Sequence, residues 1–241
     1  MSEGGASKGS ASKGSATECG ATENGGATEN GGATENGGAT EGGNAAVSEG
    51  TGAVVGPDGQ ARCPWGLGPP DLLAYHDEEW GKPVTDDIGI FERLSLEGFQ
   101  SGLSWLTILR KRENFRAAFG GFDPAVVADF GLADVDRLLA DKGIVRNRAK
   151  IEAVINNARA ALDLPDGLAA VVWSYADDQA TAPLTTADIQ PWTPASKALS
   201  VQLRKHGFRF TGPVTAYAAM QACGIVDDHL DGCFRRKAYA V

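Results

Sequence analysis

Four side chains near the two ends of the sequence could together bind one metal ion. The chain has only three histidines and four cysteines, and Cys63 and His76 lie in one stretch. Far downstream, His229 and Cys233 are four positions apart, so both side chains would reach one side of a helical turn. Structural zinc takes four nitrogen or sulfur ligands. The spacing predicts one structural Zn²⁺ per chain that joins the two ends of the domain. The alternative is a buried cysteine and two surface histidines.

A carboxylate in apolar surroundings is the second candidate for chemistry. Residues 86–102 predict a buried helix, because apolar side chains cover most of its circumference. Glu97 falls on an apolar stripe of this helix, where Gly98 and Gly102 leave space for a close-approaching group. A buried carboxylate is costly unless it has a hydrogen-bonding partner or a function. Two interpretations remain open, a salt-bridged structural residue and a functional one.

Aromatic residues accompany both candidate features. Trp65 and Tyr75 lie beside the first two candidate metal ligands. Trp105 opens the next helix, directly after Ser104, which is suited to be its N-cap. Aromatic faces near a carboxylate can bind a flat, cationic heterocycle. Ordinary core packing is the alternative, and we favour it for Trp80.

The elements that would position these residues are helices. Asp123-Pro124 and Thr193-Pro194 each combine an N-cap residue with a proline suited to the first helical position. Gly143 and Gly207 lie where helices should end. The apolar spacing predicts three further helices, over residues 146–162, 194–205 and 213–223. No segment alternates apolar and polar residues for long, so we expect an all-α domain.

The connection between the last two of these helices, Gly207–Gly212, could bind phosphate. A short glycine-bounded turn that leads into a helix N-terminus presents backbone N–H groups to an anion. Such a helix-hairpin-helix holds duplex phosphates without reading the sequence. Its candidate DNA contacts are Lys205, Gly207, Arg209 and Gly212. A plain helical connector is the alternative. Three other basic groups, each by itself more often a solvated face, are Arg110/Lys111/Arg112/Arg116, Arg146/Arg148/Lys150 and Arg235/Arg236/Lys237.

The first 60 residues differ in composition from the rest. They contain 17 of the 32 glycines, eight acidic and two basic residues, and no aromatic residue, and a six-residue Ala-Thr-Glu-Asn-Gly-Gly unit recurs in them. Such a segment cannot bury enough apolar surface to fold. We predict a disordered tail over residues 1–60, inert or with an unknown partner, and one domain over residues 61–241.

The sequence also indicates where the protein resides. We find no run of about 18 apolar residues and no apolar segment typical of a secretory signal, so we expect a cytoplasmic protein without membrane contact. Four cysteines in such a protein do not predict a disulfide framework.

Several short strings, in this order, resemble one known family. The sequence from about Arg62 to Arg235 resembles the bacterial 3-methyladenine DNA glycosylase I family, of the helix-hairpin-helix glycosylase superfamily. The strings are Cys63-Pro64-Trp65, Ala74-Tyr75-His76-Asp77-Glu78-Glu79-Trp80-Gly81, Leu96-Glu97-Gly98, Gly102-Leu103-Ser104-Trp105, Lys111-Arg112-Glu113-Asn114 and Met220-Gln221-Ala222-Cys223-Gly224.

The resemblance implies an activity and roles for the candidate residues. It implies a monomeric enzyme that binds alkylated double-stranded DNA, extrudes the damaged nucleotide and hydrolyses its N-glycosidic bond to release 3-methyladenine. Glu97 would accept hydrogen bonds from the adenine edge, and Trp65, Tyr75 and Trp105 would line the pocket. It also favours structural zinc at the four Cys/His positions. Release of a damaged base in this way belongs to base excision repair, which we expect to take place in the bacterial cytosol.

Two positions refine the expected mechanism. Superfamily members that also cleave the strand carry a lysine just past the hairpin, where this chain has Val214, so we expect a monofunctional enzyme. Asp227 stands where the family pattern has asparagine. It is a candidate catalytic residue that would stabilise an oxocarbenium-like sugar, or else it caps a turn.

Two other classes of protein compete with this interpretation. A non-catalytic module that binds alkylated DNA is the main alternative. A zinc hydrolase or deaminase is disfavoured, because all four zinc ligands would come from the protein and the sequence lacks the combination of His-x-Glu with Cys-x-x-Cys.

Overall fold

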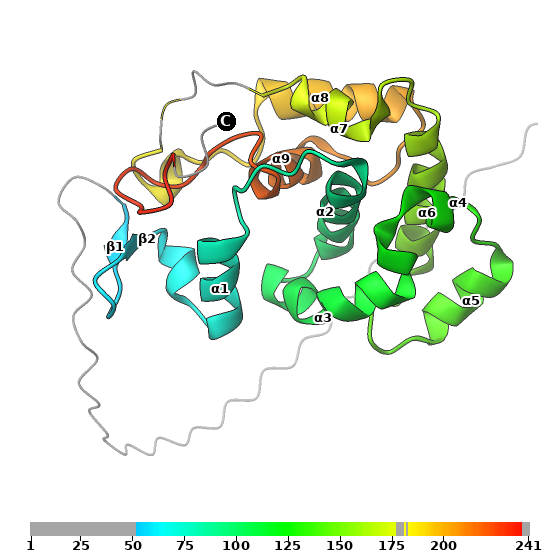
Figure 1. Cartoon of the computed structure of the whole chain (residues 1–241), viewed down its shortest axis with the longest axis horizontal. Helices are drawn as coiled ribbons and strands as arrows, with labels where there is room; N and C mark the ends of the chain where they lie inside the picture. The colour runs from blue at the N-terminus through cyan, green and yellow to red at the C-terminus, as the bar shows by residue number, and fades with distance from the viewer. Residues whose placement is uncertain (1–51, 177–180, 182, 238–241) are drawn as a thin grey trace, which may run out of the picture. The chain divides into compact units, whose positions relative to one another are not determined.

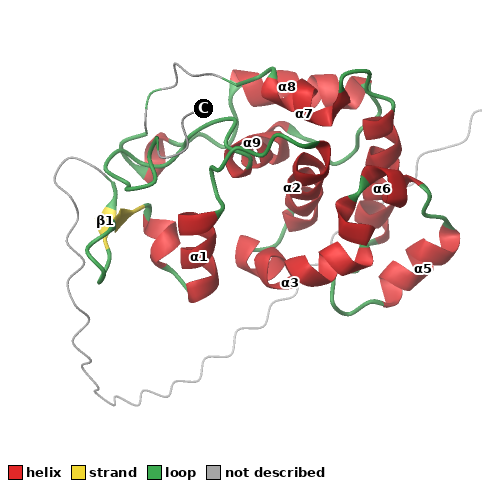
Figure 2. Cartoon of the chain, in the orientation of Figure 1, coloured by secondary structure: helices red, strands yellow, loops and turns green. Residues whose placement is uncertain are grey.

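A computed structural model describes residues 52–176, 181 and 183–237 of the chain. This part is mostly helical, as Figure 2 shows. Residues 1–51 of the predicted tail lie outside the described residues. The α-helices are α1 Pro70–Glu78, α2 Asp87–Gln100, α3 Trp105–Ala118, α4 Pro124–Ala128, α5 Leu132–Ala140, α6 Arg148–Leu162, α7 Gly167–Trp173, α8 Pro194–Lys205 and α9 Pro213–Ala222. Short 3₁₀ turns are η1 Pro64–Leu67, η2 Gly120–Phe122 and η3 Thr186–Asp188.

A small antiparallel β-hairpin corrects two expectations. Strand β1 (Val54–Val55) pairs with β2 (Ala61–Arg62), so the predicted boundary between residues 60 and 61 falls inside one hairpin. The fold is therefore mostly helical rather than all-α. Strands of two residues leave no alternating pattern to detect, and the turn between them is longer than a two-residue hairpin dipeptide. The turn is closed by Arg62, whose guanidinium donates to both oxygens of Asp58 at 2.8 and 2.6 Å.

The predicted helix starts are confirmed. The side chains of Ser104, Asp123 and Thr193 each accept a hydrogen bond from a backbone N–H in the first turn of α3, α4 and α8. The helix predicted over residues 86–102 is α2, which Asp86 caps in the same way. These caps depend on residues within one turn of sequence, which explains why they can be read without the tertiary structure.

The two predicted helix ends have different outcomes. Gly207 follows α8 and has φ +88°, a left-handed conformation that favours glycine and ends the helix. The prediction for Gly143 is wrong, because α5 already ends at Ala140. Instead, the Gly143 N–H donates to the Asp141 carboxylate at 2.7 Å, which makes a turn outside the helix.

Helix α2 forms the centre of the helical domain. It packs against α3, α4, α6, α7 and α9, which surround it in Figure 1. The core next to it contains fully buried aromatic rings, Phe91, Phe99, Phe115, Phe119 and Phe122. Burying each ring contributes roughly 1.5–3 kcal/mol. Any polar group on the buried face of α2 is therefore held in a rigid, apolar setting.

The C-terminal loop packs onto the β-hairpin and α1. The backbone N–H of Phe234 donates to Ala61 O at 2.8 Å, and Cys63, Leu230 and Cys233 share a small buried cluster with Ala53. The two ends of the domain, distant in sequence, are thus adjacent. Within the described part of the chain, no helix is both long and apolar enough to cross a membrane.

Candidate functional site

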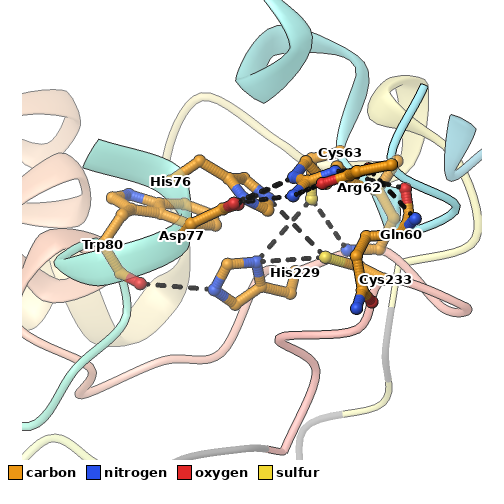
Figure 3. A network of polar contacts seen from close by, with 10 residues as sticks. Gln60, Arg62, Cys63, His76, Asp77, Trp80, His229 and Cys233 are labelled. Carbon is orange, nitrogen blue, oxygen red and sulfur yellow. Dashed lines mark hydrogen bonds and ion pairs between the residues drawn. The ribbon is translucent and has the colours of Figure 1, made fainter. Parts of the chain in front are cut away.

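The four candidate metal ligands converge in one buried cluster. Cys63, His76, His229 and Cys233 are all buried, and their ligand atoms lie within 4.8 Å of one another. Cys233 Sγ lies 3.6 Å from both His76 Nε2 and His229 Nδ1, and Cys63 Sγ lies 3.8 Å from His229 Nδ1 (Figure 3). A tetrahedral Zn²⁺ with ordinary bond lengths separates sulfur from nitrogen ligands by about 3.6 Å. The cluster can hold a metal ion, and its dimensions fit zinc.

Neighbouring groups orient both imidazole rings. His76 Nδ1 lies 2.8 Å from Asp77 Oδ1, and the Arg62 guanidinium donates to the same carboxylate. His229 Nε2 lies 3.3 Å from the backbone oxygen of Trp80. When a histidine donates from one ring nitrogen, the other is left with its lone pair for a metal. These contacts therefore aim His76 Nε2 and His229 Nδ1 at the sulfurs.

The environment of the cluster favours a thiolate. Contacts with the Cys63 thiol and with the imidazoles of His229 and His76 lower the pKa of Cys233 well below its usual range. The Leu230 N–H also donates to Cys63 Sγ at 3.4 Å. A thiolate is the form that binds metal. All four positions of such a site are filled by side chains, so the arrangement suits a structural ion.

Glu97 is buried in α2 and is not salt-bridged. Its side chain is 7% exposed, and no hydrogen bond or ion pair reaches its carboxyl group from the rest of the described chain. Burial raises the pKa of Glu97 to about 8. The structural alternative, a salt-bridged glutamate, is therefore wrong. A carboxyl group held without a partner in apolar surroundings is available to a ligand, and a cationic ligand would favour its charged form.

The predicted aromatic residues are contiguous. The Tyr75 ring lies 5.3 Å from that of Trp105 and 6.3 Å from that of Trp65, centroid to centroid. Burial, followed by the nearby charge of Glu97, raises the pKa of Tyr75 well above its usual range, so this phenol stays neutral. Trp80 instead packs its ring against His229 at 4.6 Å, the packing role expected for it.

The connection between α8 and α9 is fixed to α6 by two asparagines. Asn157 accepts from the Arg209 N–H at 2.7 Å and donates to the Arg209 carbonyl at 2.9 Å, and Asn156 donates to Gly207 O at 2.7 Å. A side chain added at Gly98 of α2 would lie 3.8 Å from Phe210 Cβ. The hairpin is therefore held to α6 and packs against α2 at Gly98, the residue that follows Glu97. Sequence reasoning missed Asn157, whose only signal is a polar residue on the buried face of a predicted helix.

The predicted basic groups differ in whether their side chains form ion pairs with carboxylates. Most arginines of the other groups are neutralised by carboxylates, in the pairs Arg110–Asp71, Arg112–Glu79, Arg116–Glu92, Arg148–Asp136 and Arg236–Asp227. Lys205 and Arg209 form no ion pair with any residue that the structure describes, and both are exposed. The α8–α9 hairpin group is thus the basic group best suited to an external anion.

Comparison with known proteins decides the family. The model of the methyladenine glycosylase family matches residues 65–236, which contain the whole of α2, the hairpin and three of the four cluster residues. The chain belongs to this family. The predicted family and the predicted class of enzyme, a glycosylase, are thereby confirmed.

This methyladenine glycosylase matches its relatives over almost their whole length. DNA-3-methyladenine glycosylase 1 of Escherichia coli (strain K12) is 49% identical over 177 residues, which are 71% of this chain and 95% of the relative. A crystal structure of 3-methyladenine DNA glycosylase I is 48% identical with TM-score 0.69, covering 73% of this chain and 99% of that one. A structure of 3-methyladenine DNA glycosylase I from Staphylococcus aureus, which concerns the structural basis of 3-methyladenine recognition, is 36% identical with TM-score 0.69. The match covers 73% of this chain and 96% of that one.

Two of the glycosylase's predicted refinements lie at its C-terminal end. Val214 is 56% exposed at the start of α9, so an aliphatic side chain occupies this position beside the hairpin. Asp227 accepts hydrogen bonds from the N–H groups of His229 at 3.2 Å and Lys237 at 2.9 Å. Its carboxylate also lies 3.6 Å from Arg236 Nε. Both oxygens of Asp227 therefore have partners inside the C-terminal loop.

Proposed function

We propose that the chain is a monofunctional DNA glycosylase that releases 3-methyladenine from alkylated double-stranded DNA in base excision repair. One observation carries this proposal, the buried, unpaired carboxyl group of Glu97 close enough to Tyr75 to affect its pKa, with the Tyr75 ring 5.3 Å from that of Trp105. The named activity of the relatives and the S. aureus structure concerned with 3-methyladenine support it. We further propose a monomer that acts in the bacterial cytosol, where the DNA lies.

Recognition rests on charge. 3-Methyladenine in DNA is cationic, and Trp65, Tyr75 and Trp105 offer ring faces that attract a cation, each contact contributing about 2 kcal/mol when desolvated. The bound cation lowers the pKa of Glu97, so the carboxyl group loses its proton to solvent. The resulting carboxylate accepts hydrogen bonds from the adenine edge. Neutral adenine gains neither contribution and leaves a buried carboxyl group without a counter-charge. The pocket therefore favours the alkylated base over the normal one.

Cleavage then needs little help from the protein. The extruded base already carries positive charge, so its bond to C1′ is weakened. Water attacks C1′, the C1′–N bond breaks, its electron pair neutralises the departing base, and the water proton passes to solvent. The chain contributes by aligning the extruded nucleotide, and extrusion itself costs a few kcal/mol. Because Val214 has no amine, a Schiff base with the sugar does not form.

DNA binding is assigned to the hairpin. We propose that the N–H groups of Gly212 and of the first turn of α9 hold phosphates of the duplex, with Lys205, Gly207 and Arg209 beside them. The Gly207 and Arg209 N–H groups instead donate within the protein, to Arg204 O and to Asn157. The absence of ion pairs to Lys205 and Arg209 within the described chain supports this role. The contact is independent of sequence, as a repair enzyme requires.

We propose that Cys63, His76, His229 and Cys233 hold one structural Zn²⁺. When bound, the ion supplies no reaction chemistry and cross-links the ends of the domain. Because Tyr75 adjoins His76 in sequence and the Trp65 ring lies 5.0 Å from the His76 ring, the cluster would also fix two of the three proposed pocket rings.

The direct test of the activity is release of free base. DNA treated with a methylating agent and incubated with the full chain should yield 3-methyladenine in solution, detected by chromatography. A protein that binds such DNA tightly and releases no methylpurine would be the non-catalytic alternative, and the enzyme proposal would be wrong.

Of the two roles considered for Asp227, we propose the turn cap. Asp227→Asn should leave the turnover number for 3-methyladenine release within about twofold of the wild type, because the amide keeps the hydrogen bond from His229. It should slightly lower the melting temperature, since the amide cannot accept equally well from Lys237. Single-turnover kinetics give the answer, and a loss of 100-fold or more would restore the catalytic role.

The hairpin should depend on its asparagine anchor. Asn157→Ala removes both hydrogen bonds to the Arg209 backbone, so we expect duplex DNA to bind about 10-fold more weakly. Fluorescence anisotropy with a labelled duplex measures this. The matched control is Asn114→Ala, which removes one long 3.4 Å hydrogen bond to Gly143 and should leave affinity unchanged. Equal affinity of the two variants would exclude the anchoring role.

A further inference from the structure

A groove runs along the exposed face of α8, apart from the proposed base pocket. It encloses about 820 Å³ and is lined by residues of α8 and of the segments next to it. The lining residues that matter below are Tyr175, Trp192, Lys197, Val201, Lys205 and His206. We call this the α8 groove, and α8 can be followed at the edge of the domain in Figure 1.

The charged residues that the structure describes in the α8 groove are both lysines. Lys197 and Lys205 line it together with the imidazole of His206, and no carboxylate of a described residue does. None of the three forms an ion pair with another residue in the described ranges. This contrasts with the neutralised arginines of α3 and α6, so the charge of the groove remains available to an anion from outside.

An exposed aromatic ring lies next to one of these lysines. The Trp192 side chain is 44% exposed, and Lys197 Nζ lies 5.5 Å from the centre of its ring. Val201, 39% exposed, adds apolar surface on the same face of α8. The Lys197 ammonium group, the Trp192 indole and the apolar side chain of Val201 thus lie on one face. Such a surface suits a polymer in which anionic groups alternate with flat or apolar ones. The sugar–phosphate backbone of DNA has this chemistry.

The α8 groove is continuous with the hairpin. Lys205 and His206 end the groove, and Gly207 begins the hairpin that we assign to phosphate binding. Helix α8 has 12 residues and is therefore about 18 Å long. DNA rises about 3.4 Å per base pair, so this length corresponds to about five base pairs. DNA held at the hairpin would lie close to the groove at one side of the lesion.

We propose that the α8 groove binds the sugar–phosphate backbone of the duplex that flanks the lesion. Phosphates contact Lys197 and Lys205, and Trp192 packs against the sugars between them. This inference depends on one part of the proposed function, namely that the hairpin binds the DNA. It assigns the groove to affinity for long DNA, with no part in base release.

Duplex length separates this site from the hairpin. The long duplex, of 25 base pairs, carries one stable abasic analogue at its centre. The short duplex, of 11 base pairs, carries the analogue about two base pairs from the end that would reach the groove, and this end is found by placing the analogue near either end in turn. Both duplexes are titrated with the full chain over a range of salt concentrations. We expect the Trp192→Ala/Lys197→Gln double variant to bind the long duplex about 10-fold more weakly at low salt. Its salt slope on that duplex should fall by about one, the share of one phosphate contact. Binding of the short duplex should not change.

Controls make either outcome decisive. Lys142→Gln removes an exposed lysine elsewhere and should alter neither duplex. An equal loss on both duplexes, or no loss on either, would overturn the proposal, as would tighter binding of a single strand than of the long duplex. Release of 3-methyladenine from a short methylated duplex should be the same for the double variant and the wild type. If neither protein releases base, the proposed function fails while the length-dependent binding still tests the groove.

Discussion

Replacing Glu97 by glutamine is expected to lower kcat/KM for 3-methyladenine release by about 100-fold. Glutamine has nearly the same shape but cannot become an anion, so the pocket loses its counter-charge to the cationic base. A charged hydrogen bond together with that attraction contributes roughly 3 kcal/mol, which corresponds to about two orders of magnitude. Single-turnover release from methylated DNA measures the effect.

The pH dependence should differ between the two proteins. Because burial raises the pKa of Glu97 to about 8, the free wild-type enzyme carries mostly the neutral form at pH 7. Its kcat/KM should therefore rise with pH until about pH 8 and level off above it. The Glu97→Gln variant should lack this rise. An identical pH profile in both proteins would contradict the proposed role.

Stability should change in the opposite direction from activity. The pKa of Glu97 is higher in the folded state than its ordinary value of 4.5, so the folded protein favours the neutral form. Below about pH 4.5 both states are neutral. Between about pH 4.5 and 8 the unfolded state loses its proton while the native carboxyl group keeps it, so the wild type loses stability as the pH rises, and the loss levels off above pH 8. The unfolding free energy of Glu97→Gln relative to the wild type should therefore increase by on the order of 4 kcal/mol between pH 4.5 and 9.

A matched control separates the effect of burial from that of the substitution itself. Glu78→Gln makes the same chemical change at an exposed residue of α1, so neither activity nor the pH dependence of stability should change. Urea unfolding at several pH values measures the stabilities of all three proteins. A Glu97→Gln variant with full base release would remove Glu97 from the mechanism.

The second large effect concerns the metal cluster. Cys233→Ser should lose the bound zinc and lower the free energy of unfolding by about 5 kcal/mol. The cluster joins residues as far as 170 positions apart, Cys63 and Cys233, and loop closure on that scale contributes an amount of this order. For a domain of this size the melting temperature should fall by about 10–15 °C. Metal analysis and calorimetry give both quantities.

A buried cysteine outside the cluster, Cys223, provides the control for this experiment. Cys223 is buried at the end of α9, outside the cluster, so Cys223→Ala should keep one zinc per chain and lose only packing energy. Removing the metal from the wild type with a chelator should reproduce the Cys233→Ser melting temperature. A wild-type protein that is metal-free after purification and unaffected by chelator would contradict the zinc assignment.

The sequence by itself determined the elements and the candidate residues. Ser104, Asp123 and Thr193 mark helix starts because a cap involves only residues of one turn. The four cluster residues could be recognised because histidine and cysteine are scarce in this chain, so that few combinations compete. Glu97 could be recognised because a carboxylate on an apolar stripe of a helix conflicts with burial.

Tertiary structure alone decided which of these groups are free to bind a ligand. Arg112 is neutralised by Glu79 from 33 positions away, whereas Lys205 has no such partner in the described chain. Asn157 reaches Arg209 across 52 positions, and the β-hairpin that begins the domain is too short to leave a pattern. Periodicity and capping report on neighbours along the chain. A hydrogen bond or ion pair between distant segments depends on how helices pack, and that packing is a property of the whole core.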